Sequence, residues 1–127
     1  MRTIKFRAWD KINSHFLELK SLEFNLSGDL LRNYPTHLNG IGKYLIGGQV
    51  ELSQFTGLLD KNGKEIWEGD VVKDDSHEGI GIVEWNNTWM KWDIGIKGEW
   101  AEDSLTVKEY IELVGNIYEN PELIKLN

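Results

Sequence analysis

The 127-residue chain contains no cysteine, only two prolines and no long run of apolar residues. The absence of cysteine excludes disulfide bonds, thiolate zinc sites and cysteine nucleophiles. A membrane-spanning helix needs about 20 consecutive apolar residues, and residues 1–11 also lack the apolar segment of a secretion signal. We therefore expect a protein of the cytoplasm that has no membrane partner.

Positive charge is also scarce, and it is unevenly distributed. The chain has 14 Lys and Arg residues against 21 Asp and Glu residues, a net charge of -7. Residues 1–63 carry 8 basic and 6 acidic side chains, whereas residues 64–127 carry 6 and 15. Nucleic-acid binding depends on basic groups that neutralise phosphates, so this balance disfavours DNA and RNA as partners. Arg2, Lys5 and Arg7 alone favour such binding, and they are equally typical of a solvated strand face.

Sequence motifs of common enzymes are missing as well. The chain has no GxSxG elbow, no phosphate-binding P-loop and no GxGxxG segment. Carboxylates and one histidine gather only within residues 70–78, as Asp70, Asp74, Asp75, His77 and Glu78. A single acidic loop rarely makes a specific metal site, because metal ligands usually converge from several elements. We therefore predict no catalytic residue, no cofactor and no metal ligand.

The apolar residues follow the two-residue period of β-strands, and no long segment keeps the period of a helix. Ile4, Phe6 and Ala8 alternate with polar residues, and residues 15–26 contain two further alternating segments. Residues 30–48 contain Pro35 and several glycines, and are predicted to form a loop with one short helical turn.

Turn residues divide the rest of the chain into short segments. Asp60-Lys61-Asn62-Gly63 is typical of a hairpin turn, and Glu68-Gly69-Asp70 predicts a second turn. A short helix is expected to begin at Pro121, with Asn120 as its cap. The pattern predicts a mostly β fold: an antiparallel, barrel-like or SH3-like domain with an N-terminal β-hairpin and short helical turns. We expect one domain over residues 1–127, with lobes 1–54 and 55–127 as the alternative.

Six tryptophans are unusual in a chain of this size. A hairpin with a two-residue turn at Asn86-Asn87 would set Trp85 opposite Thr88 and Val83 opposite Met90. Its core face would then carry Val83, Trp85, Met90, Trp92 and Ile94, and its other face Ile82, Glu84, Trp89, Lys91 and Asp93. Trp9 likewise shares a face with Lys5 and Arg7. Trp9 and Trp89 are therefore our candidate interface residues, and cover by a neighbouring loop is the alternative.

Three segments occur in order along the chain: IKFRAWDK (residues 4–11), FTGLLDKNGKEIWEGDVVK (55–73) and VGNIYENPEL (114–123). Together they resemble the YopX family of small bacteriophage and prophage proteins, with Trp67 where the family usually has Tyr. The resemblance implies a phage-encoded, mostly β protein in the cytoplasm of the bacterial host. It implies no reaction, substrate or catalytic residue.

The leading hypothesis for function is non-enzymatic binding of protein. The chain would act as a homo-oligomer, or it would dock on a host or phage protein. Exposed tryptophans and the unpaired edges of short sheets favour self-assembly. A small-ligand or nucleic-acid binding module and an unrecognised enzyme are the alternatives.

Overall fold

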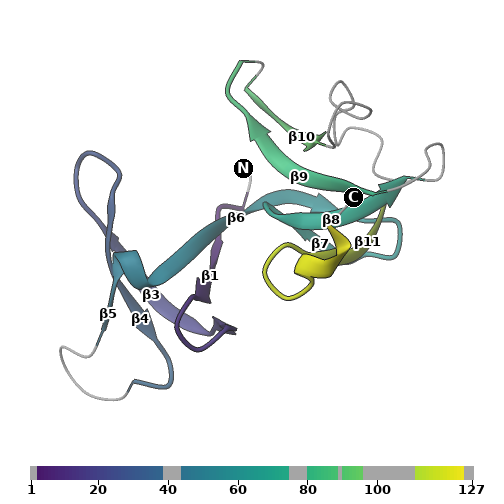
Figure 1. Ribbon diagram of the computed structural model, residues 1–127. Coiled ribbons are helices and arrows are strands. Elements are labelled where there is room, and N and C mark those ends of the chain that lie inside the picture. Colours follow the sequence, from purple (N-terminus) through teal and green to yellow (C-terminus); the bar gives the residue numbers. More distant parts are fainter. Residues whose placement is uncertain (1–2, 39–43, 75–79, 89, 96–110, 125–127) are drawn as a thin grey trace. The chain divides into compact units, whose positions relative to one another are not determined.

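The protein is mostly antiparallel β-structure (Figure 1), as the sequence predicts. We analysed a computed structural model, which describes residues 3–38, 44–74, 80–88, 90–95 and 111–124. One of its sheets curls into a half-barrel, and the only helical segments in these ranges are short 3-10 turns. Within the same ranges, no helix is long and apolar enough to cross a membrane.

Contacts divide the chain into two compact units. The small unit is Phe6–Ser53, and the large unit is Met1–Lys5 together with Gln54–Asn127. Strand β6 (Val50–Leu59) contributes residues to both units. The single domain over residues 1–127 and the alternative lobes stay predictions.

The small unit contains two sets of strands. In one, β1 (Phe6–Asp10) pairs with β2 (His15–Leu17) and is followed in the sheet order by β6. In the other, β4 (Leu30–Pro35) lies between β3 (Leu19–Phe24) and β5 (Leu45–Ile46). A 3-10 turn, η1 (Gly47–Gln49), leads into β6. The core consists of Ala8, Leu17 and Val50, against which Leu19, Leu30, Leu45 and Leu52 pack.

The predicted loop is wrong for residues 30–35, which form strand β4, whereas a short helical turn, η1, does lie at the end of the segment. Two irregularities in the pairing of β3 with β4 explain the error. Phe24 pairs with Leu30 but Glu23 pairs with Arg32, so Leu31 is an extra residue in β4. Such a bulge shifts the alternation of buried and exposed side chains, which hides the two-residue period in the sequence. Pro35 is tolerated because it is the last residue of the strand.

The large unit is built on a four-stranded sheet. Its strands follow the order β10 (Lys91–Gly95), β9 (Gly81–Asn86), β8 (Asp70–Asp74) and β11 (Ile111–Asn116). The last part of β6 pairs with β7 (Glu65–Trp67) beside this sheet. The core consists of Ile66, Val72, Val83, Ile94 and Ile111. All five side chains are β-branched, which suits a pleated, buried surface.

Both predicted turns of the large unit are confirmed. Gly63 has a φ of 82° and donates its N–H to the carbonyl oxygen of Asp60 at 3.0 Å. Gly69 has a φ of 86°, and an added Cβ there would lie 3.3 Å from the Tyr118 ring. Glycine is needed at both turns because other residues avoid this backbone region.

The predicted register of the 80–94 hairpin is wrong. Trp85 pairs with Trp92 and Val83 with Ile94, so the connection is four residues long, not two. The Asn86 side chain explains the longer loop: it accepts the Thr88 N–H at 2.9 Å and donates to the Asp93 carboxylate at 2.6 Å. The shift is by an even number of residues, so each strand keeps its predicted faces. Met90 is the exception, because it lies in the loop with 69% of its surface exposed.

Two further expectations need correction. Trp85 and Trp92 stack edge-to-face with ring centroids 5.1 Å apart, but both are half-buried, and only Trp92 packs against the core. The 3-10 turn η3 (Pro121–Leu123) does begin at Pro121, as predicted. Asn120 does not cap it with its side chain, whose oxygen instead accepts the N–H of Asn116 at 3.2 Å.

Candidate interaction surface

Trp9 lies on the face of β1 predicted for it. The buried side chains of β1 are Ala8 and Asp10, whereas Arg7 and Trp9 are half-buried on the other face. Trp9 pairs with Phe16 of β2, and their rings pack edge-to-face at 5.0 Å. The Arg7 guanidinium lies 4.5 Å from the centroid of the Phe16 ring. Tryptophan, phenylalanine and arginine are thus stacked side by side, and the role of Trp9 at an interface stays a prediction.

The second candidate, Trp89, lies outside the described residues, as do residues 75–79 of the acidic loop. Asp70 is buried, and its carboxylate accepts the N–H of Trp67 at 2.7 Å. Among the residues that the structure describes, no three His, Cys, Asp or Glu side chains are grouped as metal ligands would be. The carboxylate of Asp70 thus stabilises the turn between Trp67 and Asp70.

A second surface of the small unit was not predicted. The register of β3, β4 and β5 fixes which side chains share a face: Leu45 lies opposite Asn33, and both point toward the core side with Leu19 and Leu30. Arg32 lies between Glu23 on one side and Ile46 on the other. We call the opposite side of this sheet the outer face; it carries Ser21, Glu23, Arg32, Tyr34, Tyr44 and Ile46.

Neighbouring side chains on the outer face contact one another and so hold each other in place. Arg32 donates a hydrogen bond to the Glu23 carboxylate at 2.7 Å. Its guanidinium lies 4.8 Å from the centroid of the Tyr44 ring, and the rings of Tyr44 and Tyr34 are 6.0 Å apart. The hydrogen bonds to Glu23 and Tyr44 raise the pKa of Arg32, which therefore stays charged. Tyr44 is still 40% exposed and Ile46 63% exposed.

Charge and exposed apolar surface are divided between the two units. The small unit has five basic and five acidic residues, so the large unit carries the whole net charge of -7. Ten large hydrophobic side chains are exposed among the described residues. Six of them belong to the small unit: Ile12, Phe24, Leu26, Leu31, Tyr44 and Ile46. The smaller unit is thus electrically balanced, and among the described residues it holds more of the exposed large hydrophobic side chains.

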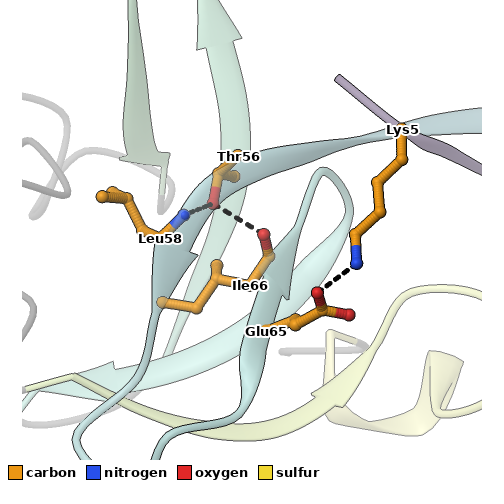
Figure 2. A network of polar contacts seen from close by, with 5 residues as sticks. All are labelled: Lys5, Thr56, Leu58, Glu65 and Ile66. Carbon is orange, nitrogen blue, oxygen red and sulfur yellow. Dashed lines mark hydrogen bonds and ion pairs between the residues drawn. The ribbon is translucent and has the colours of Figure 1, made fainter. Parts of the chain in front are cut away.

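The large unit holds a polar network around Lys5 (Figure 2). The Lys5 ammonium forms an ion pair with Glu65 and lies 4.7 Å from the Phe55 ring centroid. Beside it, the Thr56 hydroxyl donates to the carbonyl oxygen of Ile66 at 2.6 Å and accepts the N–H of Leu58 at 3.1 Å. These contacts join Lys5 to the β6–β7 hairpin and join the two strands of that hairpin to each other. We therefore infer that the network stabilises the fold and is not a binding site.

Two further buried aspartates, Asp10 and Asp60, also accept hydrogen bonds from the backbone of turns. The Asp60 carboxylate accepts three backbone N–H groups, from Asn62 at 2.8 Å and from Lys64 and Leu113 at 2.9 Å. Burial alone would raise the pKa of Asp60, but these hydrogen bonds outweigh it and hold the pKa below the ordinary value. Asp10 shows the same balance. Burial alone would raise the pKa of Asp10, but hydrogen bonds, first among them that from the Asn13 side chain, outweigh burial and lower the pKa. A carboxylate occupied in this way is a poor general base.

Comparisons with known proteins support the resemblance noted in the sequence. The model of the YopX protein family matches residues 5–125. The solved structure of protein EF1440 from Enterococcus faecalis is similar, with 24% identity, a TM-score of 0.69 and coverage of 98% of this chain and 100% of that one. Protein yopX from Bacillus subtilis is 23% identical with a TM-score of 0.59 and the same coverage. No curated protein matches. At these identities the two structures show the fold alone.

Proposed function

The chain belongs to the YopX protein family, and from this premise we propose that it acts without catalysis, by binding protein through its small unit. The first partner that we propose is a second copy of the chain. The observation that carries the proposal is the combination of exposed apolar side chains and balanced charge in one unit.

Physical reasoning favours the small unit over the large one. Exposed apolar groups gain free energy when a partner covers them, by about 25 cal/mol per Å². Two copies of the large unit repel each other because each carries a net charge of -7, whereas two copies of the small unit do not. Tyrosine, tryptophan and arginine are also the side chains that contribute most to binding at protein interfaces.

Balanced charge in the small unit further disfavours nucleic acid as a partner. A DNA-binding surface needs an excess of cations to displace the counterions of phosphates. Arg32 is already paired with Glu23 on the outer face. A host or phage protein is the other partner that we expect, and it would compete with self-association for the same unit.

A matched pair of substitutions tests the proposal. Ile46 in the small unit and Ile4 in the large unit are the same residue type with nearly equal exposed fractions, 63% and 60%. We expect Ile46→Lys to weaken self-association in sedimentation velocity and Ile4→Lys to leave it unchanged. Equal effects of the two substitutions, or a wild-type chain that stays monomeric at every concentration, would refute the proposal.

A further inference from the structure

We infer that the outer face of β3, β4 and β5 is a two-fold self-interface, in which Glu23 and Arg32 of one copy meet Arg32 and Glu23 of the other. This inference rests on the proposed function and names its partner and its contact residues. It begins from the pairing of Glu23 with Arg32 on adjacent strands, with both side chains 42% exposed.

Composition of the outer face argues for a protein partner. Tyr44 and Ile46 are both exposed, and they flank the Arg32 side chain on the same side of the sheet. Tyrosine and arginine are enriched in the buried centres of interfaces, where a few side chains carry most of the binding energy. The half-buried Tyr34 extends this aromatic surface, since its ring lies 6.0 Å from that of Tyr44.

Charge on the outer face argues that this partner is a second copy. In a two-fold interface, a contact between one residue of the first copy and a different residue of the second recurs across the axis with the roles reversed. The residues that define the outer face include one cation, Arg32, and one anion, Glu23, on neighbouring strands. A copy turned through 180° therefore places each charge near its opposite, whereas a strongly acidic or basic partner gains nothing from a balanced face.

The Arg32 side chain is already held in one conformation before any such contact forms. Its guanidinium is held between the Glu23 carboxylate and the Tyr44 ring, so little side-chain freedom remains to be lost on association. The planar guanidinium has five donors, and it can keep its bond to Glu23 while it donates to the Glu23 of another copy.

Mixing two charge-reversed variants tests the inference. In Glu23→Arg each outer face has two cations, and in Arg32→Glu it has two anions, so each variant alone should lose self-association, with the dissociation constant raised more than about 100-fold. An equimolar mixture should associate again, because one face is then positive and the other negative. A purely structural role for the ion pair would not be rescued by mixing.

The large unit offers a matched control. Lys73 and Glu112 form a similar cross-strand ion pair at 2.8 Å, between β8 and β11. Lys73→Glu and Glu112→Lys should leave association unchanged, alone or mixed. If a reversal at Glu23 or Arg32 prevents folding, Ile46→Lys and Ile46→Glu give the same mixing test at an exposed position.

Outcomes for the inference and for the proposed function are distinguishable. Wild-type chains that associate while the Glu23 and Arg32 variants associate equally well would overturn the outer face as the interface and leave self-association intact. Wild-type chains that stay monomeric would overturn both. Loss in each variant and recovery in the mixture is the result that we expect.

Discussion

Replacing Asp60 by Asn should destabilise the large unit, although the two side chains have nearly the same shape. The Asp60 carboxylate uses one oxygen for the N–H groups of Asn62 and Lys64 and the other for that of Leu113. An amide has a single oxygen, so its NH2 group must face a backbone N–H. Because Asp60 is only 6% exposed, water cannot easily replace the lost acceptor.

The size of this destabilisation follows from the hydrogen bond that the substitution removes. A hydrogen bond to a charged group is worth about 1.5 to 3 kcal/mol, and we expect Asp60→Asn to lower the free energy of unfolding by about that amount. Urea denaturation followed by tryptophan fluorescence measures it well, since five of the six tryptophans belong to the large unit. Glu84→Gln is the control: it makes the same charge change at an exposed position of β9 and should cost less than about 0.5 kcal/mol.

The stability of the protein at acid pH should also depend on the Asp60 carboxylate. The folded pKa of Asp60 lies below its unfolded value, so its contribution is fully present above the unfolded pKa of about 3.9 and is lost as pH falls through the folded pKa. Stability of Asp60→Asn should therefore fall less steeply than that of the wild type below about pH 4. Equal costs of Asp60→Asn and Glu84→Gln at pH 7, with parallel acid limbs, would refute the reasoning.

Three other substitutions have predicted effects on stability by urea denaturation. Gly69→Ala should cost about 1 to 3 kcal/mol, and more than Gly63→Ala, because both have positive φ but only Gly69 has side chains within 4 Å of the added Cβ; equal costs would contradict this. Trp92→Ala should cost about 2 to 4 kcal/mol and more than Trp85→Ala, since only Trp92 packs against the core; the reverse order would be evidence against that packing. Thr56→Val should cost about 1 to 2 kcal/mol through its two hydroxyl hydrogen bonds, and an unchanged midpoint would show that they contribute nothing.

Local turn chemistry explains which parts of the fold were predictable. The sequence predicts the Asp60–Gly63 turn correctly because glycine and aspartate act there through the backbone of their own turn. The register of the 80–94 hairpin is not predictable in this way, because Asn86 hydrogen-bonds to Asp93, seven residues away, and a local pattern does not show this contact. Strand β4 is hidden in the sequence because its extra residue, Leu31, interrupts the two-residue alternation.

The same distinction applies to the candidate surface. The sequence places Trp9 on its face correctly, since β1 pairs with β2 without a register shift and its last residues alternate between buried and half-buried. Arg32, Tyr44 and Ile46 could not be brought together, because their juxtaposition depends on pairing across β4 and β5, and β5 is only two residues long. Uneven charge along the sequence does indicate a difference between the two parts of the chain, since 15 of the 21 acidic residues lie in the second half.

Hydroxyl-radical footprinting at low and high protein concentration tests the central claim most directly, because it reports association and its location together. Tyr44 is 40% exposed on the outer face of the small unit, and Met90 is 69% exposed in the large unit. We predict that oxidation of Tyr44 falls as the mass in solution rises above the 14.7 kDa of one chain, while oxidation of Met90 stays constant. Association that protects Met90 and leaves Tyr44 equally reactive would contradict the claim.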